Sequence, residues 1–95
     1  MPEEVRAVAD LLERRYVISV IWASLEGAAR FNEFRQAVEG VPSRTLTERL
    51  RELETAGVLE RQLVNASPPY AEYRLTDRGR RLAPVLQALG AWRGA

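Results

Sequence analysis

The sequence predicts a mainly helical domain with one small β-hairpin, built as a single unit over residues 1–95. Apolar residues recur at the spacing of amphipathic helices in the segments before residue 57 and after residue 76. Between them, two short strand-like segments flank the turn-forming stretch Asn65–Pro69. The hairpin is therefore expected to lie directly before the last helix.

The composition excludes several classes of protein. None of the 95 residues is cysteine or histidine, and all 14 basic residues are arginine. A Cys/His zinc site, a disulfide, a thiol redox switch and catalysis by a Ser-His or Cys-His pair are therefore excluded. The hydrophobic share of 46% is typical of a globular chain, and no apolar run could span a membrane. We expect a soluble, cytoplasmic binding protein with no signal peptide, enzymatic activity, metal or cofactor.

The net charge of +1 is unevenly distributed along the chain. Residues 1–42 carry five arginines and seven acidic residues, whereas residues 43–81 carry eight arginines and six acidic residues. The positive surplus thus falls on the middle and later part of the chain. This asymmetry is weaker than that of a basic arm, so by itself it is only a minor indication of nucleic-acid binding.

The first two helical segments arrange their apolar residues differently. Residues 3–13 gather them on one face, and residues 16–25 are apolar on nearly all sides. We therefore expect residues 16–25 to form the central, buried helix. A third, short helix of about two turns is predicted over residues 30–38. The following Gly40-Val41-Pro42 is expected to end it.

The next segment, residues 44–56, is predicted to be one amphipathic helix. Ser43 is expected to cap its N-terminus, and Gly57 is expected to end it. Its core face carries Leu46, Leu50 and Leu53. The opposite face carries Arg44, Glu48, Arg51 and Thr55, with Thr45, Thr47 and Glu52 on the flanks.

A hairpin and a final helix complete the chain. Residues 58–64 and 70–75 are predicted strands, and the second places Ala71, Tyr73 and Leu75 on one face. Thr76 is expected to cap the last helix. Pro84 lies inside that helix and is expected to kink or restart it.

The predicted elements have the layout of a winged helix-turn-helix, which is a short helix, a tight turn, a second helix and then a hairpin. The second helix of such a domain enters the DNA major groove, where arginine contacts guanine, glutamate contacts cytosine, and hydroxyls contact bases or phosphates. We expect this helix to bind the major groove of double-stranded DNA and the hairpin to bind the backbone or minor groove. The predicted DNA-binding residues are Arg30, Arg35, Ser43, Arg44, Thr45, Thr47, Glu48, Arg51, Arg61, Asn65, Ser67 and Arg74.

These residues also have a plainer interpretation. Polar residues cover the outer face of any surface helix, and solvation alone accounts equally well for Arg61 and Arg74. The near-neutral charge also leaves open a second function, that of a winged-helix adaptor that contacts proteins and does not bind DNA.

The chain resembles the HxlR-type winged helix-turn-helix transcriptional regulators of bacteria and archaea, which are relatives of the MarR class. The resemblance covers about four-fifths of the chain, from Arg15 to Trp92. It is carried by ARFNEF (29–34), PSRTLTERLRELE (42–54), AGVLER (56–61), PPYAEYRLT (68–76), and then Gly79, Leu82, Pro84-Val85-Leu86 and Trp92. Family members commonly carry an N-terminal Cys-Pro pair that some use as a redox sensor, but this sequence has Glu3 and Glu4 there. It also has Arg15-Tyr16 where the family usually has Lys-Trp.

The resemblance implies a homodimer built from the N- and C-terminal helices. Apolar residues on those helices exceed what a small core can absorb: Val5, Val8, Leu11, Leu12, Leu82, Val85, Leu86, Leu89 and Trp92. A two-fold dimer would place its two recognition helices about 34 Å apart on a pseudo-palindromic operator. No residue pattern identifies a small-molecule effector.

Overall fold

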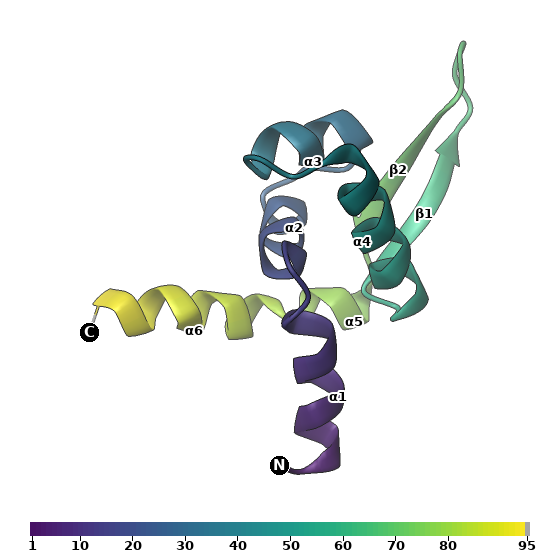
Figure 1. The fold of residues 1–95 in the computed structure, drawn as a ribbon. Helices are drawn as coiled ribbons and strands as arrows, with labels where there is room; N and C mark the ends of the chain where they lie inside the picture. Colours follow the sequence, from purple (N-terminus) through teal and green to yellow (C-terminus); the bar gives the residue numbers. More distant parts are fainter. Residues whose placement is uncertain (95) are drawn as a thin grey trace.

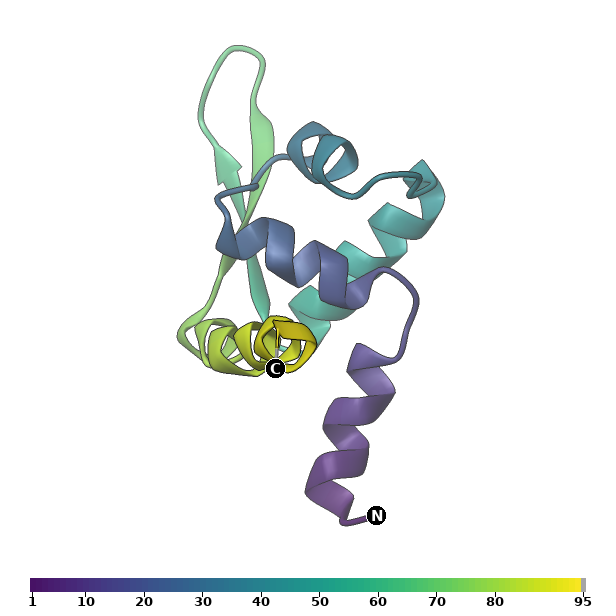
Figure 2. The ribbon, with the colours of Figure 1, turned by 90° about the vertical axis from the view of Figure 1, so that its left-hand side faces the viewer.

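The computed structural model describes residues 1–94 and arranges six helices and a two-stranded antiparallel sheet in the predicted order. The elements are α1 (Glu3–Leu12), α2 (Val17–Leu25), α3 (Phe31–Ala37), α4 (Ser43–Thr55), β1 (Leu59–Val64), β2 (Tyr70–Leu75), α5 (Asp77–Arg80) and α6 (Ala83–Gly94). The hairpin and α1 extend in opposite directions from the body formed by the other elements (Figures 1 and 2). Within residues 1–94, no helix is long and apolar enough to cross a lipid bilayer.

The core lies where α2, α3 and α4 meet the base of the hairpin. Ile21 of α2 and Phe34 of α3 are fully buried there. Leu46, Leu50 and Leu53 of α4 are buried beside them, which confirms the predicted core face of this helix. Burial of each leucine contributes about 1.5–3 kcal/mol. This anchoring turns the opposite face of α4 to solvent.

Helix α2 is less buried than its sequence predicts. Val17, Val20 and Ile21 are fully buried, but Ile18 and Trp22 are 38% and 41% exposed. The prediction of a helix buried on all sides is therefore wrong for this face. The physical reason is that α6 only partly covers it, so a hollow remains between the two helices.

Helix α4 begins and ends one residue earlier than predicted. Pro42 has extended backbone and its carbonyl accepts the first helical hydrogen bond, from Leu46, so Pro42 takes the cap position. Ser43 is the first helical residue, and the prediction that it is the cap is wrong. At the other end Gly57 adopts a left-handed backbone with φ of 76°, as predicted for a helix stop.

Strand β1 pairs with β2 from Leu59↔Leu75 to Val64↔Tyr70. The strand begins one residue later than predicted, because the amide of Val58 closes the end of α4 by donating to Leu53. The amide of Tyr73 also donates to the carbonyl of Ala29, at 2.8 Å. This bond ties the hairpin to the segment that leads into α3.

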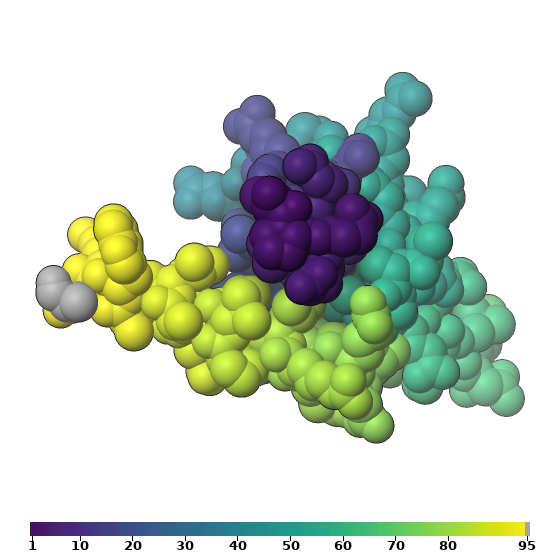
Figure 3. All heavy atoms as spheres, turned by 90° about the horizontal axis from the view of Figure 1, so that it is seen from below, coloured from purple at the N-terminus to yellow at the C-terminus, as the bar shows by residue number. Residues whose placement is uncertain are grey.

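The predicted last helix is divided in two. Thr76 caps α5, where its hydroxyl accepts a hydrogen bond from the amide of Gly79. The chain then restarts as α6, with Pro84 in the first turn, where its missing N–H costs no helical bond. Seen from below, α5 and α6 run along the underside of the molecule and α6 extends beyond the body (Figure 3).

Candidate nucleic-acid interface

The helix-turn-helix is formed by α3, the turn at residues 38–42, and α4. Glu33 fixes the start of α3, because its carboxylate accepts hydrogen bonds from the amides of Arg30 (2.8 Å) and Ala29 (3.0 Å). These bonds favour the ionised carboxylate and hold the pKa of Glu33 below its ordinary value. Arg30 therefore stands at a well-defined position directly before α3.

The solvent-facing side of α4 carries the side chains predicted to face DNA. Arg44 is 93% exposed in its side chain, and its Nε lies 3.5 Å from Oε1 of Glu48, one helical turn later. Arg51 is also exposed, on the same helix. An exposed pair at this spacing is worth about 0.3–0.5 kcal/mol, so Arg44 can exchange Glu48 for a base or a phosphate at little cost.

Hydroxyl side chains occupy the first turns of α4. Ser43 and Thr47 are exposed, whereas Thr45 is half-buried. The hydroxyl of Thr47 donates to the carbonyl of Ser43 at 3.0 Å, which leaves its oxygen available as an acceptor. Among these three residues, Ser43 and Thr47 are the more accessible to a ligand.

The hairpin and α3 enclose a hollow of about 250 Å³, which we call the wing notch. The guanidinium of Arg30 lies over the ring of Tyr70, 3.7 Å from its centroid. Stacking uses the face of the guanidinium and leaves its N–H groups directed outward in the plane. The notch is lined by Arg30, Phe31, Asn32, Arg61, Tyr70, Ala71 and Tyr73. The structure thus brings together two arginines that were predicted separately, with Tyr70 and Asn32, which the sequence analysis did not single out.

The other predicted residues lie apart from the wing notch. Arg35 is exposed on α3, and Asn65 and Ser67 are exposed in the hairpin loop. Arg74 forms an ion pair with Glu72 at 3.2 Å. It borders a different hollow, next to α2 and α6. None of these four residues lines the wing notch with Arg30 and Arg61.

A further arginine of α4 was missed by the sequence analysis because it looks like one more polar residue on a surface helix. Arg49 is only 12% exposed in its side chain. Its Nε donates to the backbone carbonyl of Arg15 at 2.9 Å, which joins α4 to the α1–α2 connection. No local pattern in the sequence signals a bond between residues this far apart in the chain.

The apolar residues predicted to form a dimer interface fall into two groups. Val5 and Val8 on α1 and Val85, Leu89 and Trp92 on α6 are exposed, with Trp92 82% exposed. Leu11, Leu12 and Leu82 are half-buried against the core, and Leu86 is 3% exposed. Leu86 thus belongs to the core of the single chain, because α6 turns this one side chain inward onto α2.

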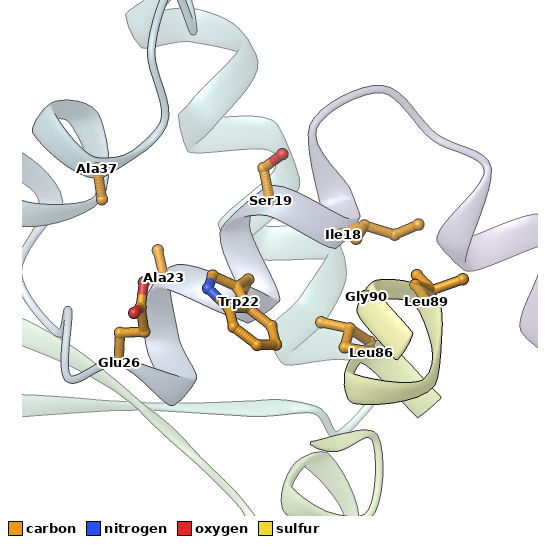
Figure 4. A pocket seen from close by; sticks show the side chains of 9 residues that line it. All are labelled: Ile18, Ser19, Trp22, Ala23, Glu26, Ala37, Leu86, Leu89 and Gly90. Carbon is orange, nitrogen blue, oxygen red and sulfur yellow. The ribbon is translucent and has the colours of Figure 1, made fainter. Parts of the chain in front are cut away.

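The exposed part of α6 borders an apolar groove of about 410 Å³ between α6 and α2. Figure 4 shows Trp22 and Ile18 of α2 facing Leu86 and Leu89 of α6 across it. The groove also holds Ser19 and Glu26. It forms an apolar surface separate from the polar side of α4.

Within residues 1–94, no group of three or more His, Cys, Asp or Glu side chains is placed to hold a metal ion. The chemistry that these surfaces offer is hydrogen bonding and charge from arginine, threonine and glutamate. This chemistry and the fold together place the protein in the class of winged helix-turn-helix regulators.

Comparison with known proteins identifies the family. The family model for HxlR-like helix-turn-helix proteins matches residues 11–95, and the chain belongs to this family. Among its relatives is a transcriptional regulator of Bacillus subtilis, the HTH-type protein YvaP, which is 40% identical over 83 residues. That match covers 87% of this chain and 77% of YvaP. The chain is therefore a helix-turn-helix transcriptional regulator and not an enzyme.

Solved structures show the same fold. The reduced form of the transcriptional regulator YodB from B. subtilis superposes with a TM-score of 0.87 at 32% identity, covering 97% of this chain and 90% of YodB. The reduced form of HypR, described as a redox regulator, gives a TM-score of 0.86 at 33% identity, covering 95% and 89% of the two chains. None of the 95 residues here is cysteine, so a thiol switch among them is excluded.

Proposed function

We propose that this regulator is a homodimer that binds double-stranded DNA sequence-specifically, with α4 in the major groove and the hairpin on the backbone or minor groove. The observation that carries the proposal is the division of α4 into two faces. Leu46, Leu50 and Leu53 fix one face to the core, while Arg44 and Glu48 stand on the exposed one. A rigid helix that presents forked donors and an acceptor suits direct recognition of base edges.

The wing notch supports backbone contact beside that helix. Arg30 and Arg61 line one small hollow, and the stacked ring of Tyr70 restricts the rotamers of Arg30. A phosphate accepts hydrogen bonds from in-plane guanidinium N–H groups. We assign the notch to a DNA phosphate, whose binding positions the protein without reading sequence.

The homodimer is supported by apolar surface on α1 and α6 that the single chain leaves uncovered. Val5 and Val8 of α1, and Leu89 and Trp92 of α6, are between 44% and 82% exposed. Large exposed apolar surface on a soluble domain often marks a protein–protein contact. A two-fold pairing through these helices buries them and presents two copies of α4 to a pseudo-palindromic operator.

Selection from a random pool of duplexes, followed by a salt titration on the selected duplex, tests the proposal. We expect recovery of a pseudo-palindromic sequence whose affinity falls linearly on a log–log plot against salt, because arginines displace counterions from several phosphates. Failure to recover any duplex at low salt contradicts the proposal and favours the protein-binding adaptor. A scrambled duplex of the same composition serves as the control for non-specific binding.

A further inference from the structure

The connection between α1 and α2, residues 13–16, is held by two residues of α4. Arg49 donates from Nε to the backbone carbonyl of Arg15 at 2.9 Å. Its Nη1 also donates to Oε1 of Glu52 at 2.5 Å, so the guanidinium bridges the connection and its own helix. With a side chain 12% exposed, Arg49 is shielded from solvent more than any other ion-paired arginine within residues 1–94.

Glu52 provides a second link. Its Oε2 lies 2.6 Å from Nε of Arg14, and its other oxygen accepts from Arg49. The carboxylate thus holds one guanidinium from the connection and one from α4. We call Arg14, Arg49, Glu52 and the carbonyl of Arg15 the connector clamp. A carboxylate that pairs with two guanidinium groups defines a geometry more strictly than an isolated surface pair.

The backbone at the connection is itself constrained. Tyr16 has a left-handed backbone with φ of 73° and is the only non-glycine residue within residues 1–94 with positive φ. A bulky side chain adopts this conformation only where its surroundings hold it there. Its hydroxyl donates to the carbonyl of Gly40 at 3.4 Å, in the turn between α3 and α4. The connection therefore touches both the turn and the second helix of the helix-turn-helix.

Apart from this connection, α1 is anchored by Leu11 and Leu12, which are half-buried against the core. None of its residues, Glu3 to Leu12, is buried, and it projects away from the body (Figures 1 and 2). Its direction relative to α4 is consequently set by this apolar contact at its C-terminal end and by the connection to α2. A change at the connector clamp is expected to alter this direction before it alters the core, because Arg49 and Glu52 lie on the flank of α4 and are not among its buried core residues.

We propose that Arg49 and Glu52 are positioning residues that fix the direction of α1 relative to α4, and thereby the distance between the two recognition helices of a dimer. This inference rests on the proposed function, in which α1 contributes to the dimer and α4 binds DNA. The connector clamp then determines which spacing between operator half-sites the protein accepts.

The first test is spectroscopic and needs no DNA. Because the sequence lacks cysteine, Glu4→Cys and Thr55→Cys place spin labels only on exposed positions of α1 and α4. Labelled protein is diluted with unlabelled protein so that each dimer carries one labelled chain. We expect a narrow distance distribution that broadens on adding Glu52→Gln or Arg14→Gln. Glu54→Gln, an exposed residue of the same helix outside the clamp, is the matched control and should leave the distribution narrow.

The second test measures binding to the selected duplex and to versions with one base pair added or removed between half-sites. We expect the parent protein to lose affinity about tenfold or more on the altered spacings, which is about 1.4 kcal/mol. Glu52→Gln and Arg14→Gln should lose clearly less, whereas Glu54→Gln should behave as the parent. Unchanged distance distributions, or equal spacing discrimination in all variants, overturn the inference. Failure of the parent protein to bind any duplex refutes the proposed function instead. The widths of the spin-label distance distributions still decide whether the connector clamp positions α1.

Discussion

Arg30, at the start of α3, stacks on Tyr70, the first residue of β2, with its guanidinium 3.7 Å from the ring centroid. The backbone hydrogen bond from Tyr73 to Ala29 joins β2 to the segment directly before α3. The hairpin and the first helix of the helix-turn-helix are thereby coupled at two adjacent points. A phosphate in the wing notch would contact both elements at once.

Replacing Tyr70 with alanine removes the surface on which Arg30 stacks. We expect the affinity for DNA to fall by about 0.5–1 kcal/mol, equally for all sequences, because the lost interaction orders a phosphate contact. Fluorescence anisotropy with the selected and the scrambled duplex measures this. Tyr70→Phe keeps the ring and should bind as the parent does. Equal losses for Tyr70→Phe and Tyr70→Ala would show that stacking is not the reason.

A charge on the exposed apolar face of α6 should prevent dimerisation. We expect Trp92→Glu and Leu89→Glu to give monomers in sedimentation velocity experiments, because a buried, unpaired carboxylate costs more than the contact provides. Leu63→Glu, on an apolar residue of the hairpin whose 67% exposure lies between those of Leu89 and Trp92, is the control and should stay dimeric. A dimer that survives both α6 substitutions places the interface elsewhere. Leu86 is unsuitable for this test because it lies in the core.

Gly79 of α5 lies directly against the backbone of Val58, in the segment between α4 and β1. A Cβ at this residue would overlap the carbonyl oxygen of Val58. We expect Gly79→Ala to lower the free energy of unfolding by about 1–3 kcal/mol, as overpacking does in a closely packed site. Urea denaturation measures the loss. Arg80→Ala, at an exposed position of the same helix, should change stability by less than about 0.5 kcal/mol. A Gly79→Ala variant as stable as the parent would contradict the close approach.

The Glu33 cap should make stability depend on pH in a defined direction. Its pKa in the folded protein is below the ordinary value of 4.5, because two backbone amides bind the ionised carboxylate. The ionised group therefore stabilises the fold above its unfolded pKa, and this contribution is lost as pH falls through the folded pKa. Glu33→Gln should reduce stability at pH 7 and differ progressively less from the parent as the solution is acidified. The control is Glu39→Gln, which removes one exposed carboxylate that makes no such cap. If the difference in free energy of unfolding between the parent and Glu33→Gln grew on acidification, the ionised Glu33 would not be the stabilising form.

The order of elements was predictable because local chemistry determines it. Leu46, Leu50 and Leu53 mark one helix face whatever surrounds them, and Thr76 caps its helix through a bond to an amide three residues away. Pro84 restarts the last helix because of its own missing N–H. Each signal acts within a few residues, so the sequence alone was sufficient to locate it.

The contacts that position the candidate interface were not predictable in this way. Arg49 appears polar in the sequence, yet it is nearly buried because a carbonyl 34 residues earlier accepts its hydrogen bond. Leu86 and Leu89 follow the same apolar pattern, but only the path of α6 across α2 decides that the first is buried and the second exposed. Such outcomes depend on how elements cross in space, which periodicity does not encode.

Whether the exposed face of α4 reads DNA sequence is tested by comparing the binding preferences of the parent protein and Arg44→Ala at every operator position. Within residues 1–94, the exposed Arg44 side chain forms an ion pair with Glu48 alone, so we expect its removal to leave the fold intact. We predict that Arg44→Ala loses about 1–3 kcal/mol of discrimination at one position of each half-site, while Arg61→Ala weakens binding uniformly. If both variants weakened binding to all sequences equally, α4 would not read bases through Arg44.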